Sequence, residues 1–202
     1  AAAFKDWNPS HFLDVAEMTA ALAIGYDWLY HDLSPDARQT IRQAIVEKGL
    51  KPGLKGGWWV NTTNNWSQVC HGGLTLCALA VRRHHPTLAK RIIDRAIEKI
   101  DRPMSEYHPD GAYPEGPAYW AYGTGYNVVL IDALKSALGS SFNITDDDSF
   151  MSTARYYLHA HGPTMQYVNY SDCRPSASLS PAAFWFARQQ NTPSLLWMER
   201  KK

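Results

Sequence analysis

Apolar residues recur along the chain at the three- and four-residue intervals typical of amphipathic helices, and alternation typical of strands is rare. In a helix expected from His11 to Tyr30, one face carries Phe12, Val15, Ala16, Thr19, Ala23 and Tyr26. Similar spacing predicts further helices over residues 35–48, 65–83, 86–104, 118–138, 147–161, 181–190 and 193–201. The best strand candidate is residues 164–170. The predicted fold class is therefore all-α.

Capping residues and loop lengths predict how these helices connect. Ser10, Ser34 and Asn65 stand where N-caps are expected, and Gly139 stands where a helix should end. Tight turns near residues 32–34 and 84–86 alternate with long loops over residues 49–63 and 108–117. Helices joined by tight turns pack as antiparallel hairpins. Hairpins stacked side by side place both long loops at the same end, where we expect function.

Charge and cysteine content exclude several classes of protein. The chain has 20 Lys and Arg against 19 Asp and Glu, a net charge of +1, so no concentrated basic face is expected to bind nucleic acid. The cluster Arg82-Arg83-His84-His85 lies at a predicted helix end, where it can offset the helix dipole. No run of about 18 apolar residues could cross a membrane. The three cysteines lack metal-ligand spacing, and Cys70 and Cys77 are expected in the core.

Two segments, residues 58–73 and 110–123, combine aromatic and amide side chains where a long loop meets a helix. Tryptophan rings offer flat faces for sugar rings, and helix N-termini offer unpaired N–H groups to anions. Tyr119, Tyr122 and Tyr126 are spaced to share one helix face. Purely structural explanations stay open: Asn65 as an N-cap, the tyrosines as core, and His71 as a buried core histidine. Gly72-Gly73 within a helix indicates close helix packing.

Four stretches of the sequence together resemble the helical domain of heparinase II/III-like polysaccharide lyases, a group that includes related oligoalginate lyases. These stretches are residues 6–14 (DWNPSHFLD), 23–29 (AIGYDWL), 64–70 (NNWSQVC) and 114–120 (PEGPAYW). The resemblance implies antiparallel helical hairpins forming part of an incomplete (α/α) toroid, followed by antiparallel β-sheet domains. It also implies β-elimination of uronic-acid polymers, and a periplasmic or secreted location.

The resemblance also implies roles for individual residues. Asn65 matches the residue that hydrogen-bonds the uronate carboxylate, and Tyr119 matches the catalytic tyrosine, with Tyr122 in reserve one turn away. A tyrosine can act as both base and acid if its surroundings lower its pKa of about 10. Hydrogen bonds to the carboxylate spread the enolate charge that develops when the C5 proton leaves. The residues expected to bind substrate are Trp58, Trp59, Asn64, Trp66, Tyr113, Glu115 and Trp120.

Two departures from the family pattern limit what this chain is expected to do alone. Trp66 stands where some members carry a histidine. The family's other catalytic histidine, and its frequent structural zinc, lie in the β-rich region that follows the helical domain. We therefore expect residues 1–202 to be a partial toroid domain of a larger lyase, impaired on its own and holding no cofactor. Its expected partner is an acidic polysaccharide or oligosaccharide, with no nucleic acid and no membrane.

Three other functions remain open from the sequence. A non-catalytic carbohydrate-binding domain would use the same cleft, with Trp58, Trp59 and Trp120 for stacking. A glycoside hydrolase needs two carboxylates across the scissile bond, and Asp110 and Glu115 are the only such pair near the aromatic segment. Arrays of helical hairpins also serve as interaction scaffolds.

Overall fold

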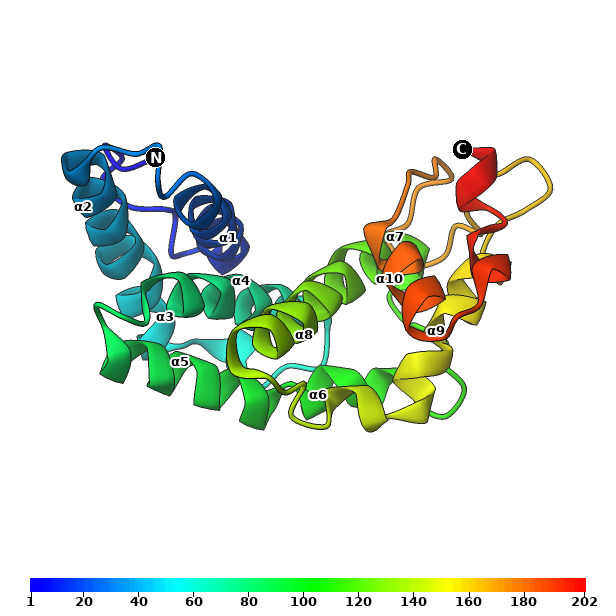
Figure 1. Ribbon diagram of the computed structural model, residues 1–202. Coiled ribbons are helices and arrows are strands. Elements are labelled where there is room, and N and C mark those ends of the chain that lie inside the picture. Colours follow the sequence, from blue (N-terminus) through cyan, green and yellow to red (C-terminus); the bar gives the residue numbers. More distant parts are fainter.

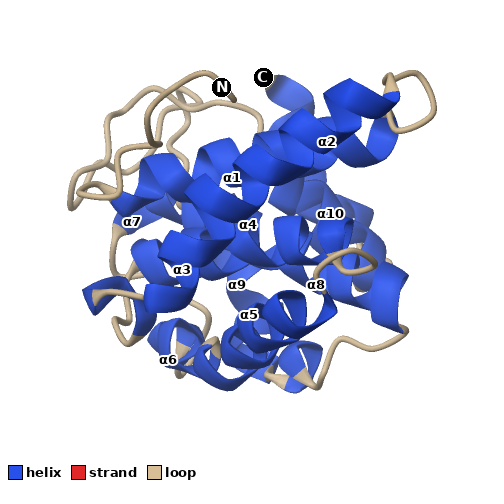
Figure 2. Cartoon of the chain, turned by 90° about the vertical axis from the view of Figure 1, so that its left-hand side faces the viewer, coloured by secondary structure: helices blue, strands red, loops and turns tan.

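The computed structural model describes residues 1–202 and is 66% helical with no strand, which confirms the all-α prediction (Figures 1 and 2). Two π-helical segments, Ile45–Leu50 and Trp120–Thr124, join α2 to α3 and α7 to α8. The α-helices are α1 (Phe12–Trp28), α2 (Pro35–Ala44), α3 (Lys51–Lys55), α4 (Asn65–Val81), α5 (Pro86–Lys99), α6 (Asp101–Met104), α7 (Gly116–Tyr119), α8 (Gly125–Leu138), α9 (Asp148–His159) and α10 (Pro181–Gln189).

Three helices run in the same direction and line the inside of an arc: α1, α4 and α8 (Figure 1). At one end His11, just before α1, contacts Trp66 of α4 with ring centroids 4.8 Å apart. At the other end Asp27 of α1, Ala80 of α4 and Ala137 of α8 line one pocket. The outer helix α5 returns antiparallel to α4 after the turn at residues 82–85. The chain thus forms an arc of parallel inner helices, with α4 and α5 paired as an antiparallel hairpin.

The glycine pair of α4 allows this close packing, as the sequence predicted. A Cβ atom on Gly73 would overlap the carbonyl oxygen of Ala16 in α1. A Cβ atom on Gly72 would lie 3.0 Å from the carbonyl oxygen of Tyr126 in α8. Neighbouring glycines therefore let α1 and α8 approach α4 from two sides.

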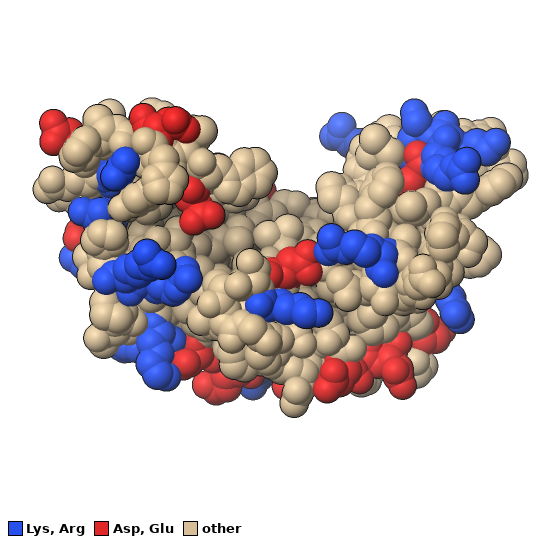
Figure 3. All heavy atoms as spheres, in the orientation of Figure 1, with Lys and Arg blue, Asp and Glu red and all other residues tan.

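The molecule is hollowed along one face, between two raised ends (Figure 3). One raised end consists of α1 and α2, and the other consists of α10 and the C-terminal segment (Figure 1). The hollow lies over the inner helices. A ligand in the hollow would therefore contact α1, α4 or α8.

Three predicted elements are wrong in extent or type. Residues 164–170 form no strand, because the only bridge there pairs His161 with Tyr167 and no second strand continues it. The first part of the predicted loop at residues 49–63 is helical to Lys55, since Pro52 falls in the first turn of α3, where a missing N–H is tolerated. Residues 193–201 form two short 3₁₀ turns instead of a helix.

Of the four predicted helix caps, two are confirmed and two are wrong. Ser34 accepts a hydrogen bond from the Ala37 N–H at 3.2 Å, and Gly139 ends α8 with a φ of 79°, both as predicted. Ser10 caps nothing, because His11 precedes α1 and the Ser10 hydroxyl donates to Asn8. The cap of α4 is Asn64, and Asn65 is the first residue of the helix.

Candidate functional site

The two segments that the sequence singled out meet through one carboxylate. Glu115, which precedes α7, accepts the main-chain N–H of Asn65 at 2.6 Å and its side-chain Nδ2–H at 2.8 Å. Because α4 and α8 are parallel, the long loops before α4 and α7 lie at the same end of the arc. The predicted convergence of residues 58–73 and 110–123 is therefore confirmed.

A chain of polar side chains continues from Glu115 into the core. The Tyr113 hydroxyl lies 2.9 Å from Glu115 Oε2 and 3.0 Å from Gln68 Oε1. Gln68 Nε2 donates to the Tyr107 hydroxyl at 2.7 Å, and that hydroxyl pairs with the Thr124 hydroxyl at 2.8 Å. We call these residues, with Asn65, the Glu115 network. Burial of so many polar groups is tolerated because all but one of the side-chain polar atoms, Asn65 Oδ1, find a partner.

The N-terminal end of α4 is occupied by the protein's own oxygens. Glu115 takes the N–H of Asn65, and Asn64 Oδ1 takes the N–H of Trp66 at 3.2 Å. Asn65 is only 3% exposed, and its Oδ1 is buried without a hydrogen-bond partner. The donors expected to hold a substrate carboxylate therefore already hold one, which belongs to Glu115.

Tyr119 is half-buried beside this carboxylate. Burial raises its pKa, and so do the negative charges of Asp172 and Glu115 and a hydrogen bond to Asp172. Tyr119 therefore does not meet the condition of a lowered pKa under which a tyrosine could act as both base and acid, because burial and two anionic neighbours act in the opposite direction. A phenol with a raised pKa keeps its proton at neutral pH, and can therefore donate it.

Tyr122 is engaged elsewhere, with Glu17 of α1. Its hydroxyl donates to the Glu17 carboxylate, and burial together with that hydrogen bond raises its pKa. Tyr126 lies next to it, with ring centroids 5.7 Å apart, and burial raises the pKa of Tyr126 to about 12. Tyr122 does not meet the condition of a lowered pKa either, and its hydroxyl links the π-helical segment before α8 to α1.

The predicted stacking residues divide into exposed and buried rings. Trp58 is 60% exposed and lies 4.7 Å from the half-buried Trp66, centroid to centroid. This Trp58–Trp66 pair leaves a ring face open beside Asn64. The other two residues predicted to stack, Trp59 and Trp120, are at most 1% exposed and present no ring face at the surface, and Tyr113, predicted to bind substrate, is buried as well.

Each buried ring has a structural partner. Trp59 stacks on Phe12 of α1 at 4.8 Å, whereas Trp58, one residue earlier in a 3₁₀ turn, points outward. Trp120 stacks on Tyr157 at 4.0 Å and donates its ring N–H to Thr153 at 2.8 Å. Composition alone could not tell which of two adjacent tryptophans faces the core.

His71 is a core histidine, as the structural interpretation of the sequence held. Its side chain is 1% exposed, packs against Trp59, and places Nε2 3.5 Å from the Val60 carbonyl oxygen. Burial, followed by the positive charge of Arg95, lowers the pKa of His71 to about 4. The ring is therefore neutral at neutral pH and does not reach the Glu115 network.

The sequence assigned no role to three residues of this region: Gln68, Tyr107 and Asp172. Gln68 lies one helical turn after Asn65 and so shares its face, which is a signal that spacing could have given. Asp172 comes from the irregular segment after α9. Only the fold shows that Asp172 lies next to Tyr119. Asp110 accepts the N–H of Ala112 at 3.1 Å within its own loop.

The chain contains no group of three or more His, Cys, Asp and Glu side chains placed to hold a metal ion. None of its helices combines the length and the apolar character needed to cross a membrane. A scan against models of protein families finds no match to this chain, and a search of curated proteins finds no similar sequence.

Proposed function

We propose that this chain is the helical domain of a polysaccharide lyase that cleaves a uronic-acid polymer by β-elimination, as the four heparinase-like stretches imply. One observation carries the proposal. The main-chain and side-chain N–H groups of Asn65 converge on a single carboxylate, at 2.6 and 2.8 Å, beside Tyr119. These donors have the geometry that a uronate carboxylate needs, and Glu115 fills it.

The chemistry follows from this arrangement. A base removes the proton on C5 of the uronate, and the electron pair spreads into the adjacent carboxylate, whose charge the Asn65 amides stabilise. The pair then forms the C4–C5 double bond while the bond from C4 to the glycosidic oxygen breaks. That oxygen takes a proton from the Tyr119 hydroxyl, so the products are an unsaturated sugar and a new hydroxyl end.

Tyr119 is protonated at neutral pH, which is the form that a general acid needs, although its raised pKa makes it a weaker proton donor than an ordinary tyrosine. The carboxylate of Asp172 lies close enough to Tyr119 to raise its pKa, and on this proposal it orients the phenol. The base that takes the C5 proton is the histidine that the resemblance places in a β-rich region following the helical domain. On this proposal the substrate carboxylate competes with Glu115 for Asn65.

The test is the ultraviolet absorbance of the unsaturated product, with alginate, heparan sulfate, hyaluronan and chondroitin as substrates. It uses this chain and a version extended through the natural C-terminus. We expect product from the extended protein, and its loss in Tyr119→Phe. The matched control is Tyr30→Phe, since the Tyr30 hydroxyl makes no hydrogen bond within the chain. Absence of product on every substrate, or full activity in Tyr119→Phe, contradicts the proposal.

A second candidate is a carbohydrate-binding domain without catalysis, which the exposed Trp58–Trp66 pair favours. Its prediction is oligouronate binding without product, weakened in Trp58→Ala and unchanged in Trp197→Ala. Trp197 is the control because it is 61% exposed, like Trp58, but has no tryptophan neighbour. Binding that Trp58→Ala leaves unchanged would remove the support for this candidate.

A further inference from the structure

A second polar region lies at the opposite ends of the same helices. A cavity opens where α1 and α4 end, lined by Tyr26, Tyr30, Arg82, Arg83 and His84. Because α4 has 17 residues, its length of about 25 Å separates this cavity from Asn65. The cavity is therefore distinct from the Glu115 network.

Arginines surround this cavity from two elements. Arg42 of α2 donates to the Tyr26 hydroxyl at 3.3 Å, and the Arg38 guanidinium lies 4.3 Å from the centroid of the Tyr30 ring. Arg38 Nε is buried without an acceptor. Arg82 and Arg83 come from the turn between α4 and α5, where Figure 3 shows Lys and Arg side chains gathered.

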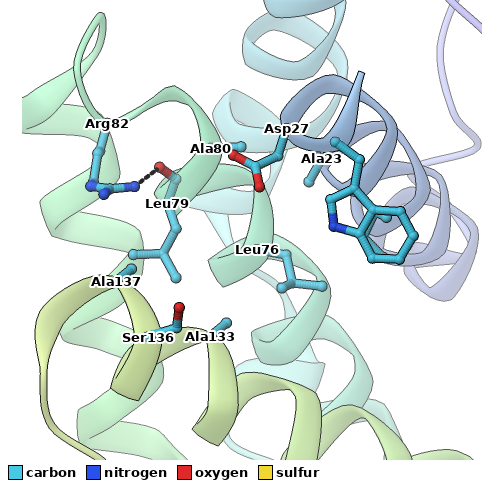
Figure 4. A pocket seen from close by; sticks show the side chains of 11 residues that line it. Ala23, Asp27, Leu76, Leu79, Ala80, Arg82, Ala133, Ser136 and Ala137 are labelled. Carbon is cyan, nitrogen blue, oxygen red and sulfur yellow. Dashed lines mark hydrogen bonds between the residues drawn. The ribbon is translucent and has the colours of Figure 1, made fainter. Parts of the chain in front are cut away.

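None of these four arginines forms an ion pair. The chain does pair Arg188 with Asp132 at 2.9 Å elsewhere, and the carboxylate that lines the cavity, Asp27, makes no such contact. Asp27 lies across the adjoining pocket from Arg82 (Figure 4). Since Asp27 is the one carboxylate in the lining, against Arg82 and Arg83, the cavity keeps a net positive charge in a chain whose net charge is only +1.

The helix dipole accounts for only one of these arginines. Arg82 donates to the Leu79 carbonyl at 2.7 Å in the last turn of α4, as a C-terminal cation should (Figure 4). Arg38 and Arg42 belong to α2 and cap nothing in α4. Their guanidinium groups can each offer two parallel N–H bonds to an oxyanion.

His84 is affected by this excess of positive charge. Its pKa is lowered by burial, and then by the charges of Arg42, His85 and Arg83. The negative charge of an anion in the cavity would offset the positive charges of Arg42, His85 and Arg83, and would therefore raise the pKa of His84. The pKa of the His84 imidazole can therefore be measured to show whether an anion occupies the cavity.

We propose that this cavity binds an oxyanion group of a ligand (a carboxylate, sulfate or phosphate) between Arg82 and Arg83, with Arg42 beside it on the Tyr26 hydroxyl. The site does not depend on the proposed lyase activity. The oxyanion can come from a small molecule or from an acidic polymer that lies along the inner helices.

The test combines titration calorimetry with NMR of the His84 ring, using inorganic phosphate, inorganic sulfate and a uronate oligosaccharide in separate arms. We expect saturable binding in at least one arm, with a higher pKa of His84 when bound. Binding should weaken by about tenfold in Arg42→Gln/Arg83→Gln, because charge-assisted hydrogen bonds are lost. Binding by the inorganic ions indicates a small oxyanion, and binding by the oligosaccharide alone indicates a polymer.

Two controls keep the outcome clear. Arg155→Gln removes an exposed arginine of α9 far along the chain, and should bind like the unaltered protein. Arg83→Gln alone changes an exposed side chain and should keep the fold, which thermal unfolding checks. The proposal is overturned if no arm shows saturable binding, or if Arg83→Gln and the double variant bind as tightly as the Arg155→Gln control. Product formation by the lyase assay is scored separately and bears on neither outcome.

Discussion

The two ends of α4 treat polar groups in opposite ways. At its N-terminal end, the Glu115 network satisfies buried amide, hydroxyl and carboxylate groups internally, at distances of 2.6 to 3.0 Å. At its C-terminal end, the arginines around the Tyr26–Tyr30 cavity have no carboxylate partner. One end is closed on itself, and the other carries charge toward the solvent.

The two ends of α4 therefore contribute differently to stability and to binding. A buried network of hydrogen bonds fixes geometry, and removing one member leaves its partners unsatisfied at about 1–3 kcal/mol each. Exposed cations contribute little to stability, but they attract anions. The N-terminal end should therefore respond to mutation through folding, and the C-terminal end through binding. The predictions below test that division.

The largest expected effect concerns pH and the buried histidine of α4. The folded-state pKa of His71 is about 4, below the ordinary value of 6.5, so between these values the unfolded chain binds more protons. Stability is therefore full above about pH 6.5 and falls as the pH drops toward 4, by up to about 3 kcal/mol. Urea denaturation across this range measures the loss.

The matched pair for this prediction is His71→Gln and His84→Gln. The first should flatten the pH dependence because it removes the buried titrating group. The second should leave it nearly unchanged, because His84 is exposed at the other end of α4. Equal effects from both variants would show that the two ends do not differ in this respect.

The next effect concerns Gly123, in the π-helical turn before α8. A Cβ atom there would overlap Gln68 Oε1 and lie 3.1 Å from Asn65 Cβ. Gln68 cannot move without breaking its hydrogen bonds to Tyr107 and Tyr113. Gly123→Ala should therefore lower the free energy of unfolding by up to about 3 kcal/mol, measured by chemical denaturation.

Gly125→Ala is the control, because a Cβ atom at Gly125 meets nothing within 4 Å. It should raise stability by about 0.5–1 kcal/mol through helix propensity. A Gly123→Ala protein as stable as Gly125→Ala would mean that the Glu115 network has more freedom than its distances indicate.

A smaller effect is expected from Glu115→Gln. The neutral amide can accept fewer of the three hydrogen bonds that Glu115 receives, so stability should fall by about 1–2 kcal/mol. Loss of the negative charge should also lower the pKa of Tyr119, which ¹³C-labelled tyrosine NMR can follow. Glu98→Gln, at an exposed surface site, should change neither quantity. An unchanged Tyr119 pKa would contradict the geometry of the candidate site.

The smallest effect belongs to the basic end. Arg83→Gln should change stability by less than about 0.5 kcal/mol, and any gain should vanish at high salt because it comes from relieving repulsion between like charges. Thermal unfolding at low and high ionic strength measures both. A loss of more than 1 kcal/mol, or about twice that limit, would place Arg83 among the structural residues.

Periodicity and spacing predicted the inner helices well because local rules govern them. Phe12, Val15 and Ala16 repeat at helical intervals and are all buried. The glycine pair of α4 likewise predicted that other helices pack closely against α4. These features depend on neighbours three or four residues away, which the sequence displays directly.

The candidate site was predictable only in part, because its contacts are long-range. The sequence drew attention to Asn65, Tyr119 and Glu115, but it assigned Asn65 to the wrong capping role and could not show that Glu115 occupies its donors. Which of Trp58 and Trp59 faces the core depends on Phe12 of α1, which stacks on Trp59. Asp172 reaches Tyr119 only because the irregular segment after α9 folds back.

The central position of α4 has a consequence for the motions of the whole molecule. It is covered by α1 on one side, α8 on another and α5 behind, and its residues from Ser67 to Thr75 are all buried. Amide hydrogens in those turns cannot reach water by fraying or by the opening of a single neighbour. Their exchange with deuterium should therefore report the free energy of complete unfolding, while α2 and the C-terminal turns exchange through smaller, local openings.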